Sequence, residues 1–547
     1  MKRKIEKYKY TIIFIFIIVV QIGVMAFYEN AKEFYHIDEI YSFESAHNIM
    51  LYSYNDEGFR IFNQDRWYNQ WHTKEEFMEH FEVRGEQSLL NHSIKEVITG
   101  RKSGILYECA LNIMCSLLGK TAANKWSGFI LNCILFFILQ ILIYKMAYCI
   151  MQTKAGAMVA VLLFGFSAGA ISLVLYVRFY YLCLLSAAFI SYFHLRLWNC
   201  RKSWQMIIYL AGVAIAGVTV YSCQPYIMTY LGSTIIAFIL MGILSKKYKL
   251  ILKYVALLVA GTVCVGIVRY EIFLNVLSMA NSDFGQRAIE GLLHRTWEKN
   301  YEYIKYFFLK LLSHVGAGII GTVVILILLL AIFFSTKIRP GVKKHIEFQN
   351  VEMIGILIAT TVIFFLLQCR LLETMAYRYM SYYYPIISVL FASGIVFVLQ
   401  NSALKKGYAC FFIAIIVVLQ LGIGYSKQYV DEIYPEAREM KETLAGYQDC
   451  DSVLFIEARH AHQYYRDGFL VPNGTDFCAV ESLDALKMNY DFMDRENGRA
   501  ILCWFPKFEW NNEEDNYRAL DRIVNVTQYS SYYKILETYQ SMVYYLY

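Results

Sequence analysis

Residues 36–41, with the sequence HIDEIY, carry the first combination of side chains that could do chemistry. The adjacent carboxylates of Asp38 and Glu39 lie about ten residues beyond an apolar stretch, and an extended chain advances at most about 3.6 Å per residue. The pair therefore stays near the membrane interface, where it can meet a lipid headgroup and still reach water. Partial burial there would raise the pKa of a carboxylate toward that of a general base. Adjacent acids in a loop are more often a solvated pair, so it is their position that favours catalysis.

Two arginines stand beside tyrosines at predicted outer membrane boundaries. Arg178 separates two apolar runs within YVRFY (176–180). Arg378 lies within YRY (377–379), and Pro385 follows six residues after Tyr379. A planar guanidinium binds a phosphate through two parallel hydrogen bonds, and a lipid phosphate would sit at this depth. The alternative is a snorkelling anchor with interfacial tyrosines, which would need no ligand. Both interpretations stay open from the sequence.

Histidine and cysteine do not form a recognisable metal site. His36, beside an acid, is more often a hydrogen-bond partner than a general base. His92, His294 and His314 have no ligand spacing, and the 13 cysteines include no CxxC pair. We therefore expect no metal; a divalent cation would require the acid pair to face inward together with a third acid.

The composition predicts a polytopic α-helical membrane protein. Of the 547 residues, 57% are hydrophobic and 18% are charged, and the mean hydropathy is +0.38. These values exclude a single soluble globule, and a scattered net charge of +6 gives no reason to expect nucleic acid as a partner. Apolar stretches long enough to span a bilayer predict eleven helices, near residues 11–28, 127–149, 157–175, 179–196, 205–222, 226–244, 249–268, 314–335, 351–369, 380–400 and 408–425.

The lysines and arginines predict the orientation of these helices. The amino terminus is basic, and it precedes an apolar run without a small-x-small cleavage site, which favours an uncleaved first span over a signal peptide. With this terminus inside, every inner loop is short and basic, as the positive-inside rule requires. Counting residues 104–119 as a further span would place those loops outside. We therefore expect this segment, which contains Glu108, to be an interfacial helix on the outer surface.

Three long segments are then predicted to lie outside the cytoplasm: residues 29–126, residues 269–313 and the chain after residue 425. We expect residues 1–426 to form the membrane domain, including the outer loop 29–126. Residues 427–547 contain 12 Lys and Arg against 21 Asp and Glu. Short strand-like runs (Val453–Glu457, Ala500–Trp504 and Met542–Leu546) between polar stretches predict a soluble, extracytoplasmic α/β domain.

The order of these features resembles the GT-C type integral-membrane glycosyltransferases, in particular the branch of the protein mannosyltransferases and aminoarabinose transferases with its bacterial relatives. The resemblance covers roughly residues 5–425. It rests on a first span followed by Asp38-Glu39, a long first outer loop with an amphipathic helix, Arg178-Phe179-Tyr180, and Arg378-Tyr379 followed by Pro385. In one departure, many bacterial relatives carry His-Pro-Pro before the amphipathic helix, and this chain has RKSG at residues 101–104, with Tyr107 the only remnant.

The resemblance implies a multi-pass cell-membrane enzyme with a GT-C-like fold. Its donor would be a polyprenyl-phosphate-linked sugar, transferred with inversion to an acceptor glycan, lipid or protein on the outer face. Asp38 would be the general base, Glu39 would orient it or hold the acceptor, and the two arginines would offset charge on the departing phosphate. The expected substrate-binding residues are His36, Tyr41, Arg178, Tyr180, Arg378 and Tyr379. No cofactor is required for this chemistry.

Two other classes of protein compete with this interpretation. A lipid or polysaccharide transporter or flippase could use outer arginines to guide a lipid, but transporters often have related halves and broken helices near the midplane, and the sequence suggests neither. A non-catalytic membrane scaffold would use its acidic outer domain to bind a partner. That interpretation gains if Asp38 proves dispensable.

Overall fold

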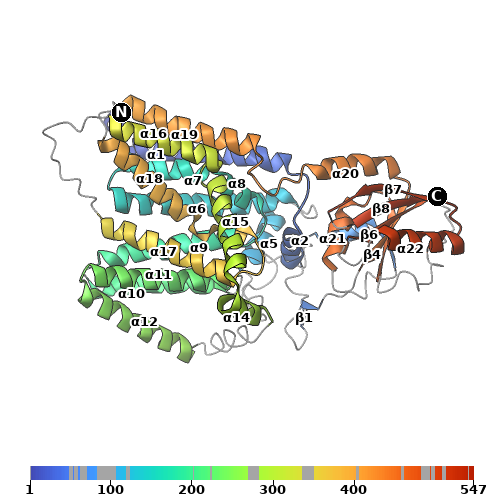
Figure 1. Cartoon of the computed structure of the whole chain (residues 1–547), viewed down its shortest axis with the longest axis horizontal. Helices are drawn as coiled ribbons and strands as arrows, with labels where there is room; N and C mark the ends of the chain where they lie inside the picture. The colour runs from blue at the N-terminus through green and yellow to red at the C-terminus, as the bar shows by residue number, and fades with distance from the viewer. Residues whose placement is uncertain are drawn as a thin grey trace.

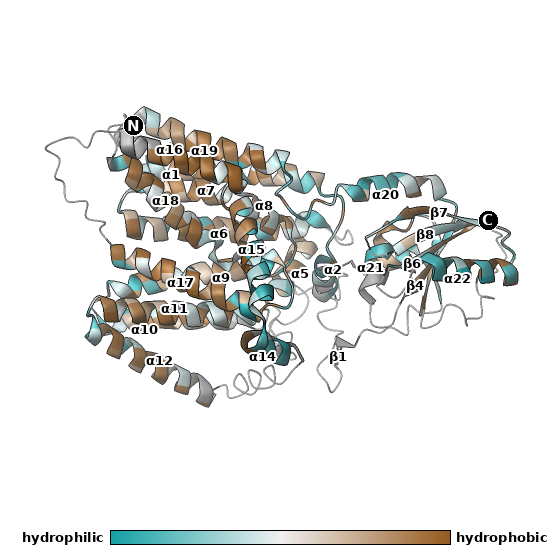
Figure 2. Cartoon of the chain, viewed as in Figure 1, coloured by the Kyte–Doolittle hydropathy of each residue, from teal (hydrophilic) through white to brown (hydrophobic). Residues whose placement is uncertain are grey.

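The structure is a computed structural model of the whole chain. It describes residues 2–47, 53–54, 60–61, 70–79, 81–82, 106–118, 124–200, 202–221, 224–268, 283–335, 350–401, 406–456, 461–481, 493, 499–507, 513–539 and 541–547. A bundle of long helices occupies one end of the molecule and a small α/β domain the other (Figure 1). The bundle helices are largely apolar, whereas helices of the α/β domain such as α20 (Glu436–Leu444) and α22 (Glu513–Val526) are largely hydrophilic (Figure 2).

Apolar helices occur at every position where the sequence predicted a span. They are α1 (Lys2–Ala31), α6 (Lys125–Met151), α7 (Lys154–Gly165), α8 (Ala168–Leu175), α9 (Tyr180–Trp198), α10 (Ser203–Tyr221), α11 (Tyr226–Leu244), α12 (Tyr248–Val268), α16 (Gly318–Ser335), α17 (Val351–Leu371), α18 (Tyr384–Asn401) and α19 (Lys406–Ser426). Within the described part of the chain, seven helices are long and apolar enough to cross a membrane, or nine if two bent pairs are each one span. The predicted count of eleven is not confirmed.

The structure contains two bent helix pairs, and the first lies within the predicted span 157–175, where the expectation of an unbroken helix was wrong. Helices α7 and α8 meet at 58°, and α15 (Trp297–His314) meets α16 at 66°. The first break follows Gly165, and Ser167 caps the new helix by accepting the N–H of Ala170. The second contains Gly318, whose φ of +70° suits glycine. Gln420 on α19 donates to Val315 O (2.7 Å) and to Leu163 O (3.5 Å), so one amide serves carbonyls freed at both breaks.

The end of the bundle nearer the α/β domain carries shorter helices and turns (Figure 1). Helix α2 (Ile37–His47) packs against α5 (Leu106–Leu118), which matches the position of the predicted interfacial helix near residues 104–119. Helix α14 (Asp283–His294) lies beside α17, and the single turns η3 (Tyr377–Tyr379) and η4 (Ser381–Tyr383) precede α18. The RKSG stretch that replaces the family's His-Pro-Pro lies outside the described residues.

The α/β domain is built on a six-stranded sheet with the order β3-β5-β4-β6-β8-β7. Strands β4 (Asp451–Ile456), β6 (Ile501–Pro506) and β8 (Ser541–Leu546) coincide with the three predicted strand-like runs, and β5 (Asp476–Glu481) and β7 (Tyr532–Glu537) are additional. Strand β4 pairs in parallel with both neighbours, while β8 pairs antiparallel with β6 and β7. Leu454 and Trp504 face the membrane domain's hydrophobic cluster, whereas Val453 and Cys503 belong to a second cluster under α22.

One edge of this sheet comes from far away in the chain. Strand β3 (Trp71–Thr73), in the first outer loop, pairs antiparallel with β5, so that Trp71 lies opposite Cys478. The helix that follows, α3 (Lys74–Glu79), buries Lys74, which donates to the carbonyl of Gly468 on α21 (Ala461–Leu470). The sheet therefore ties the α/β domain to the outer loop of the membrane domain. Two further short strands, β1 (Ser53–Tyr54) and β2 (Arg60–Ile61), pair with each other.

Candidate active site

A capping box at the start of α2 positions Asp38. The Nδ1 atom of His36 accepts the backbone N–H of Asp38 (3.0 Å), and the Oε2 atom of Glu39 accepts the backbone N–H of His36 (2.7 Å). This reciprocal pattern satisfies N–H groups that a helix leaves unpaired in its first turn. Burial and, to a smaller extent, nearby arginines lower the pKa of His36 to about 3 against the opposing effect of the charge of Asp38. A neutral His36 is therefore a structural cap, with its Nδ1 lone pair already in use.

The carboxylate of Asp38 is surrounded by donors. Tyr176 donates to Oδ2 (2.8 Å), and Nη2 of Arg378 lies 3.3 Å from the same atom. Arg178 instead donates to the carbonyl oxygen of Asp38 (3.0 Å) and to the hydroxyl of Ser42 (3.1 Å). The Asp38 side chain is 24% exposed, so it remains accessible from the outside.

The pKa of Asp38 is shifted in the opposite direction from the sequence expectation. Burial acts to raise it, but the charges of Arg178 and Arg378 and the hydrogen bond from Tyr176 outweigh burial, and the pKa falls below its usual value. The carboxylate is therefore fully ionised at neutral pH.

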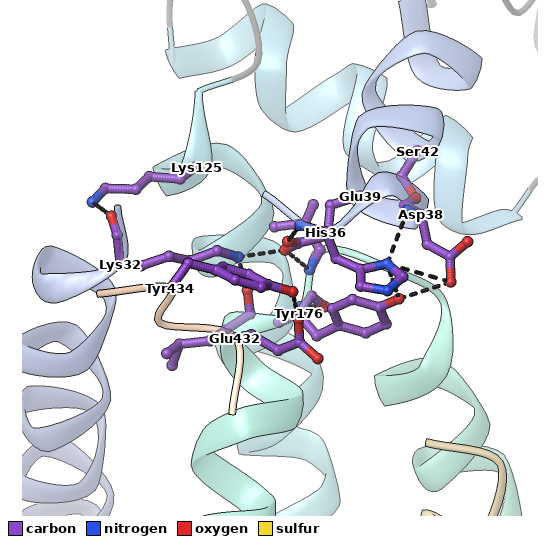
Figure 3. A network of polar contacts seen from close by, with 12 residues as sticks. Lys32, His36, Asp38, Glu39, Ser42, Lys125, Tyr176, Glu432 and Tyr434 are labelled. Atoms are coloured by element: carbon purple, nitrogen blue, oxygen red, sulfur yellow. Dashed lines mark hydrogen bonds and ion pairs between the residues drawn. The ribbon is translucent and has the colours of Figure 1, made fainter. Parts of the chain in front are cut away.

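Glu39 is buried behind Asp38 and does not face the same space. Its side chain and that of Lys32 are both 0% exposed, and they form an ion pair (Figure 3). Oε1 of Glu39 also accepts the backbone N–H of Val177 (2.8 Å), and Lys32 also donates to the carbonyl of Leu175 (2.7 Å). Since Oε2 accepts the N–H of His36, both carboxylate oxygens are occupied. We call Lys32 and Glu39 the buried clamp, because they join the loop before α2 to the turn between α8 and α9.

That turn, residues 175–179, is held from the other side by α6. Asn132 donates to the carbonyls of Val174 (3.0 Å) and Tyr176 (2.9 Å), and it accepts from Tyr107 on α5. Gly128, one turn earlier on α6, has no side chain because a Cβ there would lie 2.2 Å from Val177. Asn132 therefore makes hydrogen bonds between helices, and these hold the turn that carries Arg178.

Residues 427–435, which we call the connector, join the last span to the α/β domain and run beneath the site. Glu432 accepts hydrogen bonds from Tyr377 (3.2 Å) and from Tyr434, and burial raises its pKa to about 7. Asp431 pairs with Lys310 (2.8 Å) and with His314 (2.9 Å). Glu432 and Tyr434 have φ values of +69° and +54°, which are unfavourable for residues other than glycine. The connector thus holds Tyr377, the neighbour of Arg378, at a cost in backbone strain.

Of the other predicted substrate-binding residues, two tyrosines lie beside Arg378 and one lies away from it. The rings of Tyr180 and Tyr379 lie 5.9 and 5.4 Å from the guanidinium of Arg378, and they contact each other at 5.8 Å. Tyr41 is partly buried against the hydrophobic core further along α2. The sequence reasoning missed Lys32 and Glu432. Their only signal was a charged residue close to a predicted membrane boundary.

The described residues contain no group of three His, Cys, Asp or Glu side chains that could hold a metal ion. The two acids also do not point toward one another. The side chain of Asp38 is partly exposed, whereas that of Glu39 is buried in an ion pair with Lys32.

Comparison with solved structures identifies the architecture. No family model and no curated protein matches the sequence. The structure is similar to that of ArnT from Cupriavidus metallidurans bound to undecaprenyl phosphate, with a TM-score of 0.50 and 11% identity over 98% of each chain. It is also similar to ArnT of that organism in the apo state, with a TM-score of 0.51 and 10% identity over 99% of this chain and 98% of the other. The fold is GT-C-like. ArnT is a GT-C glycosyltransferase, so the similarity confirms the fold that the sequence resemblance implied.

Within this GT-C-like fold, the site combines one accessible carboxylate with two guanidiniums whose Nε atoms are buried and have no hydrogen-bond partner in the described part of the chain. The arginines and the carboxylate come from three separate places: the turn after α8, turn η3 and the first turn of α2. Such a set can bind an anion through the guanidiniums and accept a proton at the carboxylate.

Proposed function

We propose that this protein is a membrane glycosyltransferase that moves a sugar from a polyprenyl-phosphate-linked donor to an acceptor on the outer face of the membrane, with inversion. The observation that carries the proposal is the contact of Asp38 with Arg378, beside Arg178, at the end of the bundle where the α/β domain sits (Figure 1). The similarity to ArnT bound to undecaprenyl phosphate supports a lipid phosphate as the donor's leaving group.

The reaction follows from these groups. Asp38 removes the proton from an acceptor hydroxyl, whose oxygen attacks the anomeric carbon from the face opposite the phosphate. The bond between the anomeric carbon and the phosphate oxygen breaks, and its electron pair leaves with the polyprenyl phosphate. Arg178 and Arg378 stabilise the negative charge that builds up there. A phosphate leaves as a stable anion, so no second carboxylate is needed to protonate it, in contrast to glycoside hydrolysis.

Donor binding also activates the base in this scheme. In the absence of a ligand, Arg378 lies against Asp38 and lowers the pKa of its carboxyl. A donor phosphate between Arg178 and Arg378 competes with Asp38 for these charges, so the pKa of Asp38 rises when the donor is bound. The carboxylate then becomes a better proton acceptor when a sugar is in place.

The test is turnover of a synthetic polyprenyl-phosphate sugar by the purified full-length protein, followed as free polyprenyl phosphate released. Arg178→Lys and Arg378→Lys keep the positive charge but lose the paired N–H groups, so both should lose most acceptor-dependent release. Arg518→Lys, on the exposed face of α22, is the matched control. Donor that stays intact with every acceptor, together with movement of the lipid across proteoliposomes, would instead establish the flippase, a class whose expected broken helices this fold contains.

A further inference from the structure

The α/β domain brings a third guanidinium to the site. Arg466 lies on α21, which packs against α2, the helix that carries Asp38. The contact between the domains is tight at this point, since the rings of Phe469 and Tyr35 are 5.6 Å apart. Tyr35 directly precedes the His36 cap, so α21 faces the loop that leads into the site.

Aromatic rings surround Arg466, but no acid pairs with it among the described residues. Its guanidinium lies 4.2 Å from the ring centre of Tyr539, 5.5 Å from Phe34 and 5.7 Å from Tyr434. Its Nε is buried and has no hydrogen-bond partner. The neighbouring acid, Asp467, accepts hydrogen bonds from Thr538 (3.1 Å) and Ser541 (2.5 Å) instead.

Asp467 and Glu432 act on the charge of Arg466 from a distance, but neither forms an ion pair with it among the described residues. Burial lowers the pKa of Arg466, which means that the surroundings disfavour its charged form. Stacking on aromatic rings offsets part of this cost, but it satisfies none of the outward N–H groups. A buried cation without an acid partner is expensive unless an anion binds to it.

The charges around the site also favour an anion at Arg466. The groups that act most strongly on the charge of His36 include one carboxylate, Asp38, and three guanidiniums, those of Arg178, Arg378 and Arg466. The phosphodiester of a polyprenyl-phosphate sugar carries a single negative charge. With this donor bound, Asp38 and one phosphate face three guanidiniums, of which Arg466 is the one that the α/β domain supplies.

We propose that Arg466 binds an anionic group, a phosphate or a carboxylate, on the acceptor substrate. The assignment rests on the proposed glycosyl transfer, and it deepens it by naming the class of acceptor. It also gives the α/β domain a role at the site. Arg466 neutralises the negative charge of the acceptor and orients the acceptor so that the acceptor hydroxyl meets Asp38.

The experiment separates the two anion sites by filling the first. Full-length protein in detergent is saturated with undecaprenyl phosphate, and its thermal unfolding is followed as sodium phosphate replaces sodium chloride at constant ionic strength. Binding to the folded state raises the melting temperature according to mass action, which gives an apparent affinity. We expect phosphate to raise the melting temperature further, and Arg466→Gln to weaken this apparent affinity about tenfold or more.

Two further variants make the result unambiguous. Arg518→Gln, on the exposed face of α22, should bind phosphate as the wild type does. Arg466→Lys keeps the charge and loses the paired N–H groups, so a few-fold weaker affinity is expected, and this variant carries the test if Arg466→Gln does not fold. Acetate in place of phosphate tells a carboxylate-binding site from one that requires phosphate.

The proposal is overturned if both Arg466 variants bind phosphate as tightly as the wild type and differ only in melting temperature without added anion. That result would make Arg466 an aromatic contact between the domains. Stabilisation by undecaprenyl phosphate is measured in the same samples, and its absence from the wild type and every variant would count against the proposed function rather than against the anion site at Arg466.

Discussion

At the scale of single residues, the site depends on one carboxylate whose neighbours are all donors. Asp38→Asn keeps the shape of the side chain but removes the proton acceptor. We expect transfer to fall by about two orders of magnitude or more, in line with general-base contributions. Release of polyprenyl phosphate measures the loss, while membrane insertion and the melting temperature should stay near those of the wild type. Near-normal transfer by Asp38→Asn would favour the scaffold.

The pH dependence of the reaction follows from the low pKa of Asp38. In the proposed reaction Asp38 must be ionised, so kcat/KM should fall only as the pH drops through its pKa, which lies below 3.8 in the free protein. Tyr176→Phe removes the hydroxyl that donates to the ionised form. The pKa of Asp38 should then rise, and the acid limb of the profile should move upward by about 0.5–1 pH unit. An unmoved acid limb in Tyr176→Phe would mean that another group controls it.

The sequence predicted the main residues of the site and missed those that support them. Asp38, Arg178 and Arg378 could be placed together because each stands next to an apolar span at the same predicted side. Lys32 could not be assigned, because its partners Glu39 and Leu175 depend on how a loop and a distant turn fold onto each other. The direction of the pKa shift of Asp38 was also wrong, since burial was visible in the sequence but the hydrogen bond from Tyr176 was not.

At the scale of elements, the buried clamp joins the loop before α2 to the turn after α8. Lys32→Met alone leaves the carboxylate of Glu39 buried without its cation, and breaking such a pair costs about 3–5 kcal/mol. The double variant Lys32→Met/Glu39→Gln removes both charges, so its melting temperature should recover most of the loss. Transfer should stay low in the double variant, because the turn that carries Arg178 has lost the bond from Lys32 to Leu175.

This pair of variants separates positioning from stability. Melting temperature and turnover are measured on the same purified samples, and the donor KM is compared with kcat. Recovery of both the melting temperature and the turnover in the double variant would show that the buried clamp only stabilises the fold. Recovery of the melting temperature alone would establish Lys32 and Glu39 as positioning residues for the arginine and the base.

The connector makes the stability of the protein depend on pH. Burial raises the pKa of Glu432 to about 7 from an ordinary value of 4.5. Between these values the folded state holds a proton that the unfolded state releases, so the stabilisation is complete below pH 4.5 and is lost as the pH rises through 7. Glu432→Gln cannot ionise, and its melting temperature should vary less over this range than that of the wild type. Glu439→Gln, exposed on α20, should keep the wild-type slope.

Element positions were predictable to the extent that hydrophobicity determines them. Each predicted span falls on an apolar helix, and the three predicted strands overlap β4, β6 and β8. The bend between α7 and α8 was missed, because a glycine and a serine inside the apolar run 157–175 lower its mean hydropathy only slightly. Strand β3 was missed for a different reason. It has only three residues, and they form a strand because they pair with β5, which is far away in the sequence.

At the scale of the whole molecule, the site and the α/β domain share one end of the bundle (Figure 1). Arg438 and Lys441 on α20 bind Glu33, which lies three residues before His36, and Glu33 also donates its N–H to the carbonyl of Ile433 in the connector (2.9 Å). The domain is therefore attached directly to the loop that leads to Asp38. Whichever side of the membrane holds the domain also holds the reaction.

The last prediction concerns that side. The amino terminus is basic, and the helix it begins ends beside the site, so a cytoplasmic amino terminus places Asp38 and residues 427–547 outside. Alkaline phosphatase fused after Ser426 should be active, and the same reporter fused after Lys405, at the predicted inner end of α19, should be inactive. A fusion after Lys202, in another predicted inner loop, should also be inactive. Activity after Lys405 with none after Ser426 would place the carboxylate, the guanidiniums and the acceptor on the cytoplasmic side.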